Sequence, residues 1–247
     1  MIINILENIS AFQNLIYIAA SILFITGIKM LGKEDTAVKG NLLSALAMFI
    51  AVLITFLDPD VQVNPYLILA GIGLGAIVGS LIALKVKMTS IPEMVALFNG
   101  FGGLATFFIA WSEFNSVPEN TFQYVLIMLT TYIGGVTFSG SIVAYGKLSE
   151  KLKIQKTSVI TKLFTTVFYV SLAFLLYTIL ITPSIIPNFE FFTVLLVLTL
   201  LGGIGFVIPI GGGDMPVVIS LLNSFSGIAA AFAGLLLLNN VLIVAGS

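Results

Sequence analysis

The sequence predicts an all-α bundle of transmembrane helices, and three observations support this fold class. Hydrophobic residues make up 59% of the 247 residues and charged residues only 9%, with a mean hydropathy of +1.16. Apolar runs of roughly 20 residues, the length that crosses a bilayer core of about 30 Å, recur along the chain. Lysines fall only on alternate connections between these runs, as they do in polytopic membrane proteins.

We expect about eight full spans, each an uninterrupted apolar run bounded by polar or charged residues. The expected spans cover residues 12–31, 40–57, 65–84, 92–111, 121–148, 161–181, 191–210 and 215–238. A ninth apolar run begins at Val241 and stops at Ser247, so we expect a truncated ninth helix that is too short to span. No soluble domain is recognisable, and residues 1–247 are interpreted as one transmembrane domain.

The distribution of charge predicts the orientation of these spans. The ten basic residues, all lysines, lie at or beside the connections between the first and second, third and fourth, and fifth and sixth spans. The connections on the opposite side contain no lysine, and they carry the acidic residues Asp58, Asp60, Glu113, Glu119 and Glu190. The positive-inside rule makes the lysine side cytoplasmic and places the N-terminus outside.

Composition also excludes several classes of function. The chain has no cysteine and no histidine, so disulfides, thiol catalysis and thiolate metal sites are excluded, and the commonest general base and metal ligand is missing. A net charge of −1 provides no basic surface for nucleic acid. We therefore expect no metal site and no nucleic-acid partner. We assign no catalytic or cofactor-binding residue in this chain.

The most informative stretch is residues 209–216, PIGGGDMP, together with the helix that follows it. Asp214 is placed to cap that helix with its carboxylate, and Pro216 suits a first helical turn. Spacings of three and four gather small and polar residues on one face of the helix. This face consists of Ser220, Asn223, Ser226, Gly227, Ala230 and Gly234. Such a stripe is expected to face protein or water rather than lipid.

Two earlier spans carry similar stripes. The fourth has Ala96, Asn99, Gly103, Thr106 and Ala110 on one face, and the fifth has Thr130, Gly134, Thr137, Ser141 and Ala144. Close helix packing is one interpretation, because small residues let backbones approach. The other is a narrow polar path, because Asn99, Thr137 and Asn223 lie about 10–15 Å from the cytoplasmic ends of their helices. Glu93 and Asp214 either cap their helices or flank a cytoplasmic entrance.

One glycine-rich motif is interpreted as structural. Residues 71–76, GIGLGA, match the dinucleotide fingerprint, which requires a strand before the glycines and an acidic residue about 20 positions later. Here the motif lies inside an apolar span and no such acidic residue follows. Gly71, Gly75 and Gly79, spaced by four, instead predict a flat face for close helix packing.

Three segments carry a resemblance to a known family. Residues 94–104 (MVALFNGFGGL), 137–148 (TFSGSIVAYGKL) and above all 212–227 (GGDMPVVISLLNSFSG) look like the membrane domain of the β subunit of proton-translocating NAD(P) transhydrogenase. The resemblance runs nearly from end to end of the chain. It implies a multi-pass protein of the bacterial inner membrane that couples hydride transfer between NAD(H) and NADP(H) to proton movement.

The resemblance also implies roles for individual residues. Proton-pathway positions match Asn99, Thr137, Ser139, Ser141 and Asn223, and positions that couple the membrane part to the NADP(H)-binding domain match Glu93 and Asp214. Some members have a histidine where this chain has Asn99, so a direct histidine relay is not expected here. The implied partners are the transhydrogenase α subunit, an NADP(H)-binding domain and the lipid bilayer, in a homo- or hetero-oligomer.

The family continues beyond the point that corresponds to Ser247, into the rest of a ninth helix and an NADP(H)-binding domain. This sequence contains neither, so we expect the chain alone not to transfer hydride. Two alternatives stay open at this stage, a small secondary transporter or channel and a non-catalytic truncated remnant. Solute transport by the chain alone would favour the first, and poor stability without any transport would favour the second.

Overall fold

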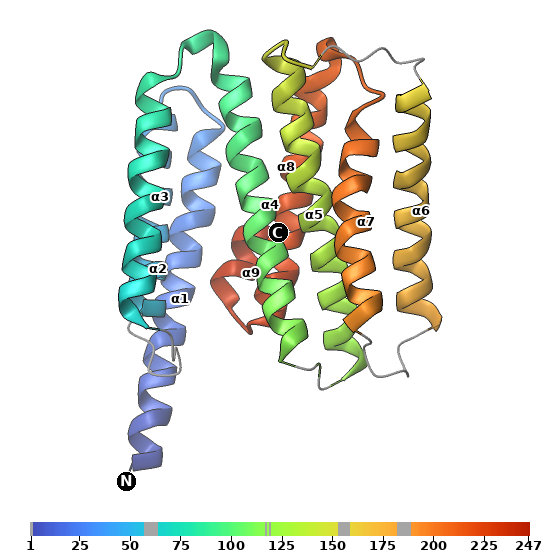
Figure 1. Cartoon of the computed structure of the whole chain (residues 1–247). Coiled ribbons are helices and arrows are strands. Elements are labelled where there is room, and N and C mark those ends of the chain that lie inside the picture. Colours follow the sequence, from blue (N-terminus) through green and yellow to red (C-terminus); the bar gives the residue numbers. More distant parts are fainter. Residues whose placement is uncertain (1, 57–63, 117, 119, 153–158, 182–188) are drawn as a thin grey trace. The chain divides into compact units, whose positions relative to one another are not determined.

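The fold was determined as a computed structural model, which describes residues 2–56, 64–116, 118, 120–152, 159–181 and 189–247, with side chains from residue 12 onward. The described residues form α-helices and short 3₁₀ turns (Figure 1). The elements are α1 (Ile2–Leu31), α2 (Ala37–Phe56), α3 (Pro65–Lys85), η1 (Met88–Ser90), α4 (Ile91–Asn115), α5 (Thr121–Leu148), α6 (Val159–Ile181), α7 (Phe189–Val207), η2 (Gly212–Asp214), α8 (Met215–Leu236) and α9 (Asn240–Gly246).

Eight of the described helices are long and apolar enough to cross a membrane, which confirms the predicted fold class of eight spans and a short C-terminal helix. The predicted spans 12–31 and 121–148 have the same limits as the candidate spans Phe12–Leu31 and Thr121–Leu148. The predicted end of the seventh span is wrong by three residues, because α7 ends at Val207. Pro209 explains the early end, since proline disfavours helical geometry in the residue before it.

The chain divides into two compact units. The first contains residues 1–81 and 238–245, and the second contains residues 82–237 and 246–247. In the first unit α1 and α2 pack closely, and a Cβ atom on Gly40 would lie 2.7 Å from the carbonyl oxygen of Gly27. A hydrogen bond of 2.8 Å between the hydroxyl groups of Tyr17 and Thr55 joins the same two helices.

The third helix departs from the prediction. Its glycine face, Gly71, Gly75 and Gly79, was expected to pack closely, yet a Cβ atom on any of them would meet no described atom within 4 Å. No residue of α3 is buried within the described part of the chain. The helix is apolar around its circumference, as a span surrounded by lipid is, so glycine spacing alone did not identify a contact.

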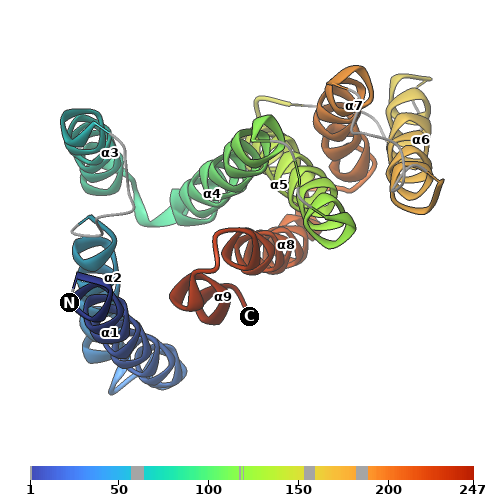
Figure 2. The same cartoon turned by 90° about the horizontal axis from the view of Figure 1, so that it is seen from below.

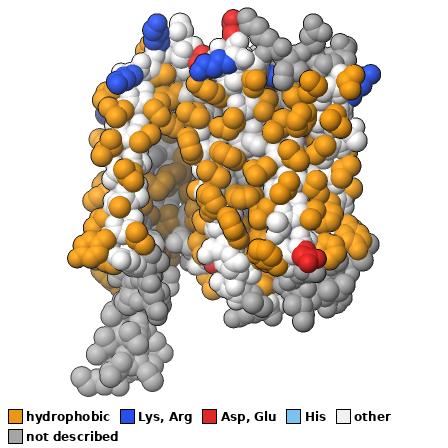
Figure 3. Space-filling view, viewed as in Figure 1, with side chains coloured by type: hydrophobic (Ala, Val, Ile, Leu, Met, Phe, Trp, Pro, Cys, Tyr) orange, Lys and Arg blue, Asp and Glu red, His pale blue; other side chains and the backbone are white. Residues whose placement is uncertain are grey.

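In the second unit α5 is the central helix. It contacts α4, α7 and α8, while α6 packs mainly against α7 (Figure 2). In this unit hydrophobic side chains cover the middle of the visible helices, and lysines lie at one end (Figure 3). In this unit the lysine end holds the starts of α4, α6 and α8 and the ends of α5 and α7. That this end is cytoplasmic stays a prediction from the positive-inside rule.

Candidate functional site

The amide of Asn99 joins three helices of the second unit. Its Nδ2 atom on α4 donates a hydrogen bond of 3.0 Å to Ser141 Oγ on α5. Its Oδ1 atom accepts a hydrogen bond of 2.7 Å from Ser226 Oγ on α8. A side-chain amide in an apolar span requires partners for its donors and acceptors. We call Asn99, Ser141 and Ser226 the amide junction.

The hydroxyl group of Ser226 has two acceptors within reach. Its Oγ atom lies 2.7 Å from Asn99 Oδ1 and 2.8 Å from the backbone carbonyl oxygen of Asn223. A hydroxyl group carries one proton, so it donates fully to only one acceptor at a time. Rotation of this single bond therefore makes or breaks the link between α8 and the amide of α4.

The stripes of α4 and α5 meet through close backbone contact. Close helix packing was one of the two interpretations of these stripes. A Cβ atom on Gly103 would lie 2.9 Å from both the Gly134 carbonyl oxygen and Thr137 Cβ. A Cβ atom on Gly134 would lie 2.7 Å from Thr106 Oγ1, and one on Gly100 would lie 3.1 Å from Ser141 Cβ. The two helices have no space for larger side chains along this seam.

Several buried hydroxyl groups on α5 have no hydrogen-bond partner among the described residues. Thr130, Thr131 and Thr137 are each fully buried, and the Oγ1 atom of each is unpaired there. An unpaired buried hydroxyl group costs about 1–3 kcal/mol, and each such group calls for an explanation such as a water or an ion. Thr137 lies one helical turn from Ser141 and shares its face of α5.

The amide junction lies between two apolar clusters of the second unit. Towards the lysine end, Ala96, Val143, Ala144 and Leu222 belong to one cluster. Towards the opposite end, Ala110, Ile127, Val136 and Leu236 belong to the other, in which the rings of Phe114 and Phe192 stack with centroids 3.8 Å apart. On each of α4, α5 and α8, the polar residue of the junction falls between these two sets in sequence. The result is a thin polar layer within an apolar bundle.

Two of the predicted pathway residues lie away from the junction. Ser139 donates to the Gly135 carbonyl oxygen at 3.0 Å and lies on the face of α5 that meets Gly203 of α7. Asn223 is exposed on α8, and its backbone carbonyl group, not its amide, takes part in the hydrogen bond with Ser226. The residue of α8 that bonds with Asn99 is therefore Ser226.

Both predicted coupling residues lie at the lysine end. Glu93 is half-buried in the first turn of α4, and Asp214 is the exposed residue directly before α8. The predicted carboxylate cap by Asp214 is wrong, because its side chain accepts no capping hydrogen bond within the described chain. Asp214 closes the 3₁₀ turn Gly212–Asp214 with ψ of −1°, whereas a capping residue adopts extended geometry. Pro216 is in the first turn of α8 as predicted.

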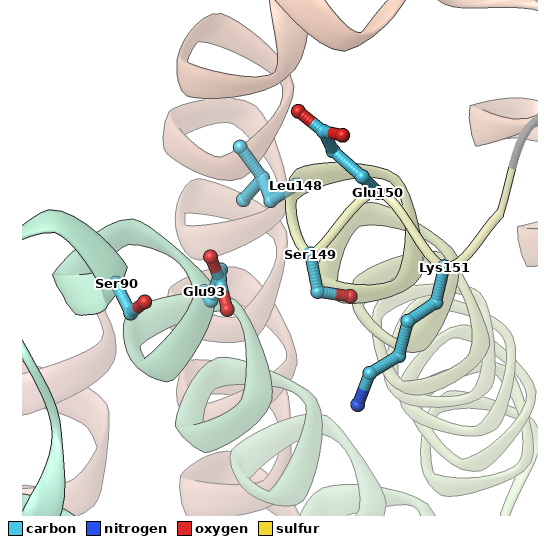
Figure 4. Close-up of a pocket in the computed structure, with 6 residues that line it drawn as sticks. All are labelled: Ser90, Glu93, Leu148, Ser149, Glu150 and Lys151. Atoms are coloured by element: carbon cyan, nitrogen blue, oxygen red, sulfur yellow. The ribbon is translucent and has the colours of Figure 1, made fainter.

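Glu93 lines an open pocket of 440 Å³ at the same end (Figure 4). Ser90 ends η1 and Glu93 lies in the first turn of α4, whereas Leu148 ends α5 and is followed by the other lining residues, Ser149–Lys151. Glu150 and Lys151 extend to opposite sides of the end of α5. The pocket therefore lies between the lysine-side ends of α4 and α5, the two helices joined by the hydrogen bond between Asn99 and Ser141.

Comparison with known proteins identifies the family. Residues 13–247 match the family described as NAD(P) transhydrogenase beta subunit. The chain belongs to this family. Two curated relatives named NAD(P) transhydrogenase subunit beta, from Rhodospirillum rubrum and from a named strain of that species, are each 36% identical over 242 residues. The match covers 94% of this chain and 51% of each relative, so the chain spans about half the length of the relatives it matches.

Two residues with notable contacts in this transhydrogenase-family chain, Ser226 and Lys147, are not among the site residues predicted from the sequence. Ser226 lies on the predicted polar stripe of α8, but the predicted pathway residue of that stripe is Asn223. Lys147 contacts backbone carbonyl groups that lie 60–63 residues further along the chain. No local pattern contains that pairing, because it depends on how α5 and α7 pack.

Proposed function

We propose that residues 1–247 form the proton-conducting membrane domain of an NAD(P) transhydrogenase β subunit. In the complete enzyme this domain would couple hydride transfer between NAD(H) and NADP(H) to proton movement. Family membership supports this proposal, and one observation carries it. Asn99 links α4, α5 and α8 through its amide in a thin polar layer between apolar clusters.

Water molecules, rather than a titrating side chain, would carry the proton through this layer. Asn99 does not ionise near neutral pH, and the chain has no histidine. The acidic residues of α4, Glu93 and Glu113, lie near its two ends, and α5 and α8 have none. Amide and hydroxyl groups hold ordered water well. Thr137, with its buried and unpaired hydroxyl group, is positioned to bind one such molecule next to the junction.

Ser226 would control the continuity of this path. When its hydroxyl group donates to Asn99 Oδ1, the three helices are linked directly. When it donates instead to the Asn223 carbonyl group, Asn99 Oδ1 becomes available to a water molecule. A change of one torsion angle at Ser226 would thus open the junction to water. Asn223, one turn towards the lysine end, would take the next water along the path.

The lysine end would meet the nucleotide-binding part of the enzyme. Glu93 and Asp214 would couple the channel to an NADP(H)-binding domain in the cytoplasm, with an α subunit supplying NAD(H) binding. The positions of Glu93 in an open pocket and of Asp214 beside the start of α8 support this role. The protein would then work in the inner membrane of a bacterium, as part of an oligomer.

The test is proton translocation by the complete enzyme carrying Asn223→Leu. In sealed vesicles, acidification driven by hydride transfer is followed with a fluorescent pH probe, normalised to folded enzyme. We expect Asn223→Leu to abolish coupled proton transport, because leucine offers no hydrogen bond to water. Ser224→Ala is the matched control, since it removes an exposed hydroxyl group at the same depth of α8. Full pumping by Asn223→Leu would remove this residue from the mechanism.

A further inference from the structure

The ammonium group of Lys147 holds the polypeptide directly after α7. Its Nζ atom donates to the backbone carbonyl oxygens of Val207 at 3.2 Å, Ile208 at 2.5 Å and Ile210 at 2.5 Å. An ammonium group has three N–H donors, and these three carbonyl oxygens lie within their reach. Lys147 is itself half-buried at the last turn of α5.

The contact is favourable for two physical reasons. The last carbonyl groups of a helix have no partner within the helix, and the C-terminal end of a helix carries partial negative charge. Lys147 supplies donors and positive charge at the end of α7. Pro209 lies within the held segment and cannot donate a backbone hydrogen bond of its own. The Val207 carbonyl oxygen also accepts a hydrogen bond of 3.1 Å from the Ile210 N–H, so the side chain of Lys147 adds to the backbone hydrogen bonds at this end of α7.

The held segment leads directly to the turn before α8. Ile210 is followed by Gly211 and by the 3₁₀ turn Gly212–Asp214, and α8 begins at Met215. Lys147 belongs to α5, which carries Thr137 and Ser141, whereas α8 carries Ser226. Lys147 thus connects the end of α5 to the segment that leads into α8, and both helices contribute to the amide junction.

We propose that Lys147 is a positioning residue that clamps the turn before α8 to α5. The effect of this clamp on proton coupling rests on the proposed function, because there the clamp transmits movement of the turn at Asp214 to the amide junction. Its structural part stands independently. Lys151, which lies at the same end, contacts a different group: it is exposed and its Nζ atom lies 3.4 Å from the Tyr145 hydroxyl group.

The structural part is tested by the mobility of the turn. The chain has no cysteine, so Gly212→Cys provides a unique site for a nitroxide spin label. A Cβ atom on Gly212 would meet nothing within 4 Å, so the label should leave the turn intact. In the labelled chain in liposomes we expect Lys147→Met to free the label, so that its rotational mobility rises above that measured with Lys147 in place. Lys162→Met is the control, since it removes the charge of an exposed lysine at the same end, and it should change nothing.

The functional part is tested in the complete enzyme. Lys147→Met should lower the number of protons moved per hydride transferred, whereas a merely structural role would lower only the amount of folded enzyme. Lys147→Gln keeps two N–H donors without the charge, and it should give an intermediate label mobility and an intermediate proton-to-hydride ratio. This variant also serves if Lys147→Met does not fold.

The possible results separate the clamp from the proposed function. An unchanged label in both Lys147 variants overturns the clamp. A freed label with an unchanged proton-to-hydride ratio overturns its role in coupling. A freed label in an enzyme whose pumping also survives Asn223→Leu and Asn99→Leu would keep the clamp and refute the proposed proton path.

Discussion

Helices α5 and α8 carry similar polar stripes in sequence but lie in different surroundings. On α5 the stripe residues Thr130, Thr137 and Ser141 are fully buried against neighbouring helices. On α8 the stripe residues Ser220 and Asn223 are exposed, and Ser226 alone reaches the amide of Asn99. The same sequence pattern, a stripe of small and polar residues, therefore has two different structural roles. A stripe of small residues brings backbones together, whereas a stripe of exposed polar groups can hold water.

The packing side of this comparison predicts the largest effect on stability. Gly103→Ala should destabilise the bundle by about 2 kcal/mol, because its methyl group would meet backbone and Thr137 Cβ on α5 at 2.9 Å. Gly102→Ala is the matched control, since a Cβ atom there would meet nothing within 4 Å. Thermal unfolding in detergent measures both. Equal melting temperatures for the two variants would show that the α4–α5 seam is looser than the structure indicates.

The link between the two regions predicts an intermediate effect. Ser226→Ala removes the hydrogen bond from α8 to Asn99 Oδ1, and interhelical bonds of this kind contribute roughly 0.6 kcal/mol, up to about 1.7. We expect that loss of stability, together with proton leak through the complete enzyme without hydride transfer, because the amide then stays open to water. Ser224→Ala should show neither change. An absence of proton leak through the complete enzyme with Ser226→Ala would argue against Ser226 as the group that controls the path.

The unpaired hydroxyl groups of α5 predict the smallest effect on stability. Thr137→Val should change the unfolding free energy by less than about 0.5 kcal/mol, because valine removes both the hydrogen bond to the proposed water and the cost of burying the hydroxyl group. Proton transport should nevertheless slow, because valine cannot hold the proposed water. Thr106→Val is the control, since that hydroxyl group already bonds to the Gly103 carbonyl oxygen at 2.9 Å. Identical transport by the two variants would contradict a water at Thr137.

Much of this fold could be predicted from the sequence because bilayer thickness sets the length of each span. The limits of the span Thr121–Leu148 followed from apolar length alone. The end of α7 did not, since hydropathy continues through Ile208 and Ile210 after Pro209 has already ended the helix. Lys153 and Lys156, with Asp58, Asp60 and Glu119, lie outside the described residues.

The candidate site could be predicted only in part, for geometric reasons. Spacing identified the facing stripes of α4 and α5, which meet at Gly103 and Gly134. It could not distinguish Asn223 from Ser226, because residues three apart differ by only about 60° around a helix. Nor could it separate the glycine face of α3, which contacts nothing in the described structure, from the glycines of α4. Long-range pairs such as Lys147 with Ile210 require the packed structure.

The most direct test of the account is coupled proton translocation by the complete enzyme with Asn99→Leu. Leucine keeps the approximate volume of the side chain but removes both hydrogen bonds of the amide junction. The account predicts that proton translocation, normalised to folded enzyme, falls at least about tenfold, while stability falls by only about 1–2 kcal/mol. Normal pumping by a folded Asn99→Leu enzyme would contradict the claim that protons cross at the junction of α4, α5 and α8.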